Sequence, residues 1–200
     1  MGRHPNPQRK QDLLDEIVAY LGEHGIGDLS LRPLAKRLGT STYTLTYQFG
    51  SKDQLLADAV RHALALQVAG VHELASVSDD APSDLVRRLW AWSTRAENLG
   101  VVRMLLEATT LAYSQPVFGG VGRQVVTEGI GLLSASLVRR GLPADAAEVH
   151  ATRTYATLIG LQVDLIATSD RERVGGALEE LCRSIDAADR QPRALAADLR

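Results

Sequence analysis

Residues 31–52 read LRPLAKRLGTSTYTLTYQFGSK, and this stretch decides the fold of the N-terminal part of the chain. Its first eight residues repeat apolar side chains at the helical spacing, and Gly39 then provides a stop. Ser41 is suited to cap a second short helix over 42–48. The pattern therefore predicts two short helices joined by a tight turn, which is the geometry of a helix-turn-helix.

The rest of the chain follows the helical period as well. Asn6 and Pro7 favour the start of a helix that Gly25 ends. Further helices are predicted over 51–74, 84–97, 101–113, 121–140, 143–168 and 170–188, with a loop over 76–83 and a flexible glycine-rich break near 115–120. Because no strand alternation occurs, we expect an all-α chain with a three-helix helix-turn-helix head in 1–50 and a helical body in 51–200.

Composition is typical of a globular protein, with 45% hydrophobic and 23% charged residues. The single cysteine, Cys182, has no internal disulfide partner, so we expect a reducing, cytoplasmic location. We also expect no signal peptide and no membrane helix. The formal net charge is −2, but residues 1–52 hold 7 Lys/Arg against 5 Asp/Glu, so the head is slightly basic.

The outward side of the second short helix carries groups that suit nucleic acid. It reads Thr42, Tyr43, Thr44, Tyr47 and Gln48, without a carboxylate to repel phosphate. Threonine and glutamine can bond base edges, and tyrosine hydroxyls can bond phosphate. Two alternatives stay open at this point: Tyr43 as part of the core, and Arg32 paired with Asp28 instead of with DNA.

From about Gln8 to Leu66 the sequence resembles the DNA-binding head of the TetR family of repressors. The match rests on an uninterrupted register of Ala35, Gly39, Ser41, Thr44, Leu45, Phe49, Gly50, Ser51 and Lys52. The chain departs from the family pattern at Thr40, where valine is usual, and at Thr46, where tyrosine is common. A tyrosine follows at position 47, so the phosphate contact is expected to shift by one residue.

The resemblance implies a ligand-released repressor that binds a palindromic operator in double-stranded DNA as a homodimer. It implies DNA contacts from Arg32, Ser41, Thr42, Tyr43, Thr44, Tyr47 and Lys52. It implies a body that binds a small-molecule effector, for which we expect the pocket residues Trp90, Arg103, Met104, Glu107, Tyr113, Phe118 and Gln124. It also implies a dimer interface on the last two helices, formed by Tyr155, Leu158, Gln162, Leu165, Val174, Leu178, Leu181 and Ile185.

Other classes of protein find less support. The five histidines lack metal-ligand spacing, and no catalytic or phosphate-binding motif occurs, so we expect no metal, no cofactor and no enzyme activity. Arg103 and Glu107 are four residues apart, so a plain surface ion pair is an alternative to a ligand clamp. The alternative function is an all-helical small-molecule-binding protein or enzyme with a vestigial head. A third reading replaces the small ligand with a protein partner.

Overall fold

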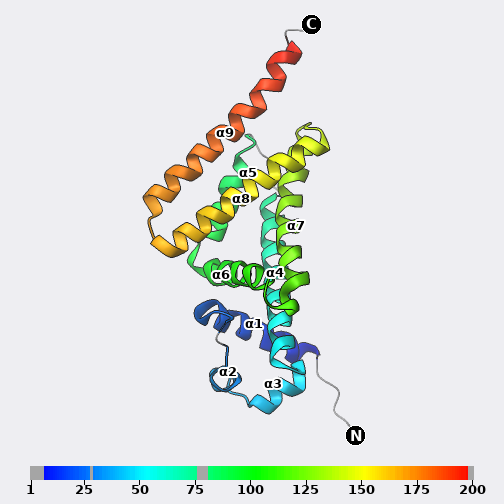
Figure 1. The fold of residues 1–200 in the computed structure, drawn as a ribbon, viewed down its shortest axis with the longest axis vertical. Helices are drawn as coiled ribbons and strands as arrows, with labels where there is room; N and C mark the ends of the chain where they lie inside the picture. Colours follow the sequence, from blue (N-terminus) through cyan, green and yellow to red (C-terminus); the bar gives the residue numbers. More distant parts are fainter. Residues whose placement is uncertain (1–6, 28, 76–80, 198–200) are drawn as a thin grey trace. The chain divides into compact units, whose positions relative to one another are not determined.

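The computed structural model describes residues 7–27, 29–75 and 81–197, and all regular structure in them is helical (Figure 1). The helices are α1 Pro7–His24, α2 Leu31–Arg37, α3 Thr42–Phe49, α4 Lys52–Ala75, α5 Asp84–Ser93, α6 Ala96–Leu111, α7 Pro116–Arg139, α8 Ala144–Thr168 and α9 Arg171–Ala197. The predicted all-α fold is confirmed. Among these helices, none combines the length and the apolar character that crossing a bilayer requires.

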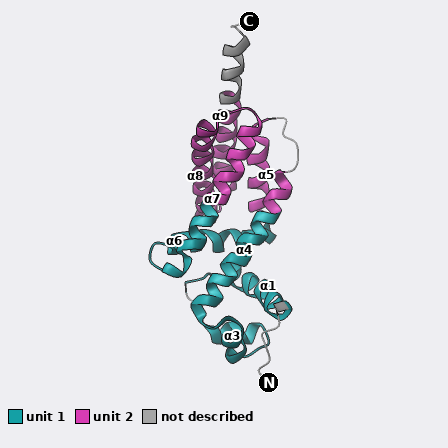
Figure 2. Ribbon diagram, turned by 90° about the vertical axis from the view of Figure 1, so that its right-hand side faces the viewer, with its two compact units in different colours: residues 1–69, 95–126 teal, residues 70–94, 127–200 magenta. Residues whose placement is uncertain are grey.

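The helices form two compact units, coloured separately in Figure 2. Unit 1 takes in the chain up to Ala69 and residues 95–126, and unit 2 takes in residues 70–94 and the chain from Thr127 onward. Two helices, α4 and α7, contribute turns to both units. The sequence predicts a division of the chain by function, into a DNA-binding head in 1–50 and a body in 51–200. The two packing units do not follow that division, which stays a prediction.

Unit 1 is built around the apolar stripe of α1. Leu13, Ile17 and Leu21 recur at helical spacing and are almost completely buried. They pack in one cluster with side chains from the neighbouring helices, among them Leu34, Leu45, Leu55, Val60, Met104 and Phe118. The helix-turn-helix thus shares its core with α4, α6 and the first half of α7.

A carboxylate of α6 closes the turn that follows α1. The backbone N–H of Ile26 donates to Oε2 of Glu107, and the backbone N–H of Gly27 donates to Oε1, both at 2.8 Å. Because these N–H groups have left the helical ladder, they need an outside acceptor. Glu107 therefore ties the α1–α2 connection to α6, although 80 residues of sequence separate them.

Unit 2 has its own apolar core. It is formed by Leu85 and Val86 of α5, Leu133 of α7, Ala151 and Leu158 of α8, and Leu178, Leu181 and Cys182 of α9. Polar contacts add to this packing, because the backbone N–H and the hydroxyl of Ser83 donate to the Asp186 carboxylate at 3.1 and 2.8 Å. Burial also raises the pKa of the free Cys182 thiol.

Several predicted boundaries are corrected by the structure. The glycine-rich stretch is not a break, since α7 begins at Pro116 and runs through it; the break lies over 112–115. A Cβ atom at Gly122 would lie 2.9 Å from Cβ of Ala112, so a small residue is needed there for close packing. The last helix also extends to Ala197 instead of ending near 188. The predicted Asn6 cap and residues 76–80 of the predicted loop lie outside the described residues.

Candidate nucleic-acid interface and ligand cavity

The turn between α2 and α3 follows directly from its sequence. After α2, the backbone N–H of Thr40 donates to the carbonyl of Ala35 at 2.9 Å, and Gly39 has a φ of +59°. That left-handed conformation carries little strain in glycine, which explains the stop at this position. Leu34 and Leu45 are fully buried on the inner sides of the two helices and fix how they pack.

Ser41 is the N-cap of α3, as its sequence position predicts. Its Oγ accepts from the backbone N–H of Thr44 at 3.1 Å and lies 2.9 Å from the Thr44 hydroxyl. The side chain is therefore committed to the start of the helix. The cap fixes the start of α3, and Ser41 itself stays exposed there.

The outer face of α3 is formed by two tyrosines and a threonine. Tyr43 is 78% exposed and Tyr47 is 45% exposed, and their rings stack with centroids 6.4 Å apart. The exposure of Tyr43 excludes the alternative in which it belongs to the core. Thr42 and Thr44 are only half-buried, so they flank this face instead of forming its centre.

Thr46 belongs to the same face, although it is not among the predicted DNA contacts. It is exposed, and its hydroxyl donates to the carbonyl of Thr42 at 2.9 Å. The signal was available, because Leu45 and Phe49 share the inner face of the helix and Thr46 does not lie on that face. Gln48 behaves in the opposite way, since its Oε1 is buried without a hydrogen-bond partner among the described residues.

Two of the predicted DNA contacts are basic residues. Arg32 on α2 and Lys52 at the start of α4 are both exposed, and neither forms an ion pair with any residue that the structure describes. Asp28, the alternative partner of Arg32, lies outside the described residues. Ser51 caps α4 by accepting from the backbone N–H of Gln54 at 3.1 Å, which places Lys52 at the first helical position.

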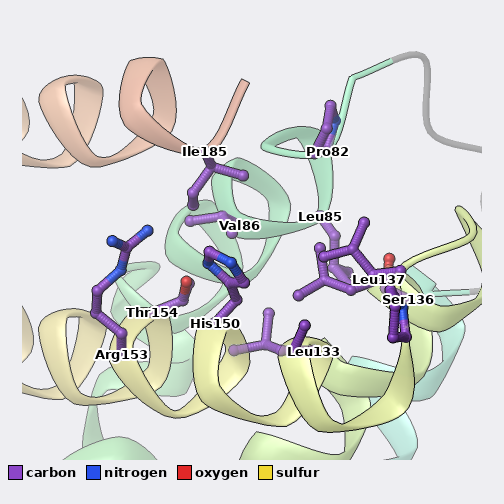
Figure 3. A pocket seen from close by; sticks show the side chains of 13 residues that line it. Pro82, Leu85, Val86, Leu133, Ser136, Leu137, His150, Arg153, Thr154 and Ile185 are labelled. Atoms are coloured by element: carbon purple, nitrogen blue, oxygen red, sulfur yellow. The ribbon is translucent and has the colours of Figure 1, made fainter. Parts of the chain in front are cut away.

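Unit 2 contains a cavity of about 210 Å³, shown in Figure 3. Its walls come from α5, α7, α8, α9 and the connection between α7 and α8. The lining residues are Pro82, Leu85, Val86, Leu133, Ser136, Leu137, Leu142, Pro143, Ala146, His150, Arg153, Thr154 and Ile185. The wall is mostly apolar, and its basic groups come from α8.

The seven residues predicted for a ligand pocket do not line this cavity and are not gathered in one place. Met104 and Phe118 are fully buried in the core of unit 1, while Glu107 closes the α1–α2 turn. Arg103 and Tyr113 are exposed on unit 1, and Tyr113 is 99% exposed. Trp90 packs against the core of unit 2, and Gln124 lies on the part of α7 that belongs to unit 1. No ion pair joins Arg103 to Glu107 among the described residues.

The residues predicted for a dimer interface divide into two groups. Five of them, namely Leu158, Leu165, Val174, Leu178 and Leu181, are buried within the single chain. The other three, Tyr155, Gln162 and Ile185, are half-buried. Burial raises the pKa of Tyr155 to about 12. The outer face of α8 carries other apolar side chains, namely Val149 at 70% and Val163 at 52% exposure.

Comparison with known proteins gives these features a family context. A family model for bacterial regulatory proteins of the tetR family matches residues 13–59. The HTH-type transcriptional regulator BetI of Burkholderia thailandensis is 30% identical over 83 residues, which are 42% of this chain and 43% of that protein. The matched segment therefore spans less than half the length of that curated relative.

Solved structures are similar over nearly the whole chain. A TetR transcription regulator from Haloarcula marismortui has a TM-score of 0.75 at 23% identity, covering 91% of this chain and 98% of that one. A transcriptional regulator from Saccharomonospora viridis, solved with choline, has a TM-score of 0.72 at 20% identity, covering 88% and 94%. Residues 13–59 thus match the model for bacterial regulatory proteins of the tetR family, and the chain has the fold of solved TetR regulators.

Proposed function

We propose that this protein is a DNA-binding transcriptional regulator that acts as a homodimer and releases its operator when a small molecule binds. Residues 1–50 supply the DNA-binding part, and residues 51–200 supply the ligand-binding and dimerisation part. The observation that carries the proposal is the outer face of α3, where Tyr43, Thr46 and Tyr47 are exposed on a helix capped by Ser41. The relatives named above are transcriptional regulators, which favours regulation over catalysis.

The chemistry of this face suits the major groove. An α-helix fits the groove of B-form DNA, and the threonine hydroxyls and methyl groups of α3 are able to contact base edges. The tyrosine hydroxyls and the cations of Arg32 and Lys52 meet phosphates on either side. Ser41 holds the helix in position and Lys52 adds charge where the N-terminus of α4 already favours an anion.

A homodimer provides the second half of the interface. Because a twofold axis pairs like surfaces, two copies would present two recognition helices to successive turns of one palindromic operator. The outer faces of α8 and α9 are suited to form the dimer, since Val149 and Val163 are exposed and Gly160 and Gly176 leave open space beside the helices. A bacterial regulator of this kind works in the cytoplasm, where its operator lies.

The small molecule is assigned to the cavity of unit 2. A ligand changes operator affinity only as far as it binds the free and the DNA-bound conformations differently. Choline, the compound in the Saccharomonospora viridis complex, is a poor candidate here. Quaternary ammonium sites use the rings of Trp, Tyr or Phe, and cations attract carboxylates, whereas neither group is found among the described residues that line this cavity.

The test is fluorescence anisotropy with labelled duplexes from the intergenic DNA beside the gene. We expect one site to bind about a thousandfold or more tightly than random DNA at the same salt concentration. Replacing Thr46 and Tyr47 by alanine should remove most of that preference, while Arg139→Gln, on unit 2 and outside the proposed interface, should keep it. Equal affinity for every duplex would refute DNA-sequence recognition by this chain.

A further inference from the structure

We propose that the cavity of unit 2 takes a compact monocarboxylate, an anionic head on a short apolar body. This inference rests on the proposed function, because it names the class of effector that the same cavity would bind. Three features of the cavity support it: a basic and polar end on α8, an apolar remainder, and a small volume. Figure 3 shows that Arg153, His150 and Thr154 gather toward one end, while Leu137, Ser136 and Pro82 lie toward the other.

The polar end has hydrogen-bonding capacity that the protein itself does not use. His150, Arg153 and Thr154 are spaced by three and four residues, so they share one face of α8. Thr154 is only 5% exposed, and no hydrogen bond joins its hydroxyl or the imidazole of His150 to another residue that the structure describes. Both groups therefore have hydrogen-bonding capacity left for a ligand.

The charged group that lines this end of the cavity is the guanidinium of Arg153. Arg153 also borders a shallow depression that contains Asp145 and Glu148, but it forms no ion pair with these or other residues in the described part of the chain. The carboxylate of Asp186, beside the lining residue Ile185, accepts from Ser83. A single guanidinium fork matches one carboxylate in shape and charge, whereas a phosphate monoester carries nearly two charges and needs more donors.

The remainder of the cavity determines the polarity and the size of the non-polar part of the ligand. Its described walls are nearly all aliphatic, from Leu85, Val86, Leu133, Leu137, Leu142, Ala146 and Ile185 with the two prolines. A volume of about 210 Å³ lies below the range of roughly 300–1,000 Å³ that is usual for drug-sized ligands. It is enough for about seven groups of the size of water. The cavity therefore favours a body of a few carbon atoms.

The experiment uses three probes with the same six-carbon chain and different heads: hexanoate, hexanol and hexylammonium. Binding to the full chain is measured by isothermal titration calorimetry at neutral pH and moderate salt. We expect hexanoate to bind about five to ten times more tightly than hexanol, because the guanidinium is partly exposed and its contribution is screened. Hexylammonium should bind more weakly than hexanol.

Three variants separate the head from the body. Arg153→Gln should reduce hexanoate affinity to that of hexanol and leave hexanol unchanged, while the matched control Arg139→Gln should change neither. Ala146→Leu, which fills part of the cavity, should weaken both. Equal binding of the three probes, no binding of hexanoate, or a hexanoate preference that survives Arg153→Gln would overturn the proposal. Operator affinity is measured separately, without any probe. A protein that binds its operator but does not prefer hexanoate would refute only the carboxylate proposal, whereas a protein that binds no operator would refute the proposed function.

Discussion

A Cβ atom built on Gly22 of α1 would lie 2.8 Å from the Cα atom of Gly100 on α6. The two helices of unit 1 therefore cross with backbone against backbone. Any side chain larger than hydrogen at this point would force them apart. This crossing lies one turn before the hydrogen bonds from Ile26 and Gly27 to Glu107. Together they hold α1 and the connection to α2 against α6, which fixes the base on which the helix-turn-helix is built.

Gly22→Ala should destabilise the protein. The new methyl group meets backbone that cannot rotate away, and overpacking of this kind costs about 1–3 kcal/mol, of which the better helix propensity of alanine returns up to about 1 kcal/mol. Urea unfolding followed by circular dichroism measures the difference. Gly120→Ala is the matched control, because it is exposed in α7 with open space around it, and it should be neutral or stabilising. A Gly22→Ala variant as stable as that control would contradict the close crossing.

Glu107→Gln should loosen the connection between α1 and α2. One of the two backbone N–H groups then faces an amide NH₂ in place of a carboxylate oxygen, and losing a hydrogen bond to a charged group costs about 1.5–3 kcal/mol. We expect lower stability in urea together with weaker operator binding, because the base of the helix-turn-helix shifts. Arg103→Gln, an exposed neighbour on α6, should leave both measurements unchanged. If Glu107 were a ligand clamp only, its replacement would spare stability.

Thr46→Val and Lys52→Gln should weaken DNA binding in distinguishable ways. A phosphate contact contributes about −0.9 to the slope of log affinity against log salt, so Lys52→Gln should make the slope shallower by about one and weaken all sequences alike. Thr46→Val keeps the charge and the side-chain shape, so its slope should stay unchanged while discrimination between operator and mutated sites falls. Anisotropy titrations at four salt concentrations measure both quantities. The same slope change in both variants would contradict the separate roles.

The sequence predicted the helix-turn-helix well because its signals are local. The side chain of Ser41 accepts from the N–H of Thr44, three residues later, and Gly39 ends α2 through its own backbone conformation. Both signals can therefore be recognised in a short stretch of sequence. The role of Glu107 was hidden, because its partners lie 80 and 81 residues away and no local pattern encodes them. The cavity was missed for a related reason. Leu133 and Leu137 keep the period of any buried helix, and that period is the same whether the side chains meet a neighbour or an empty space.

The ion pair of Lys10 with Asp58 should make the stability of unit 1 depend on pH in acid. Burial acts to raise the pKa of Asp58, but hydrogen bonds from Lys10, Gln54 and Arg61 outweigh it and lower the pKa below the ordinary value. A carboxyl with a lowered folded-state pKa binds protons more readily in the unfolded chain. Its stabilisation is therefore fully present above about pH 4–5 and is lost as the pH falls through the folded-state pKa.

Lys10→Met tests this contribution. We expect the variant to be less stable by about 1 kcal/mol near pH 7, with a difference that shrinks in acid as Asp58 becomes protonated. The Lys10 ammonium also lies 5.2 Å from the centroid of the Phe49 ring, and that contact does not depend on a titrating carboxyl. Urea unfolding at several pH values separates the two. A difference that stays constant down to pH 3 would assign the whole effect to the ring contact.

Val163→Glu should separate dimerisation from folding. Val163 is 52% exposed on the outer face of α8, so a glutamate there costs the isolated chain little, whereas in a twofold interface the charge would be introduced twice. Analytical ultracentrifugation should show a monomer with unchanged helical content, and operator affinity should fall because one recognition helix is lost from each complex. Val138→Glu is the matched control, since Val138 is a 44% exposed valine on α7, and it should remain dimeric. A dimer that tolerates glutamate at position 163 would move the interface to another face of the molecule.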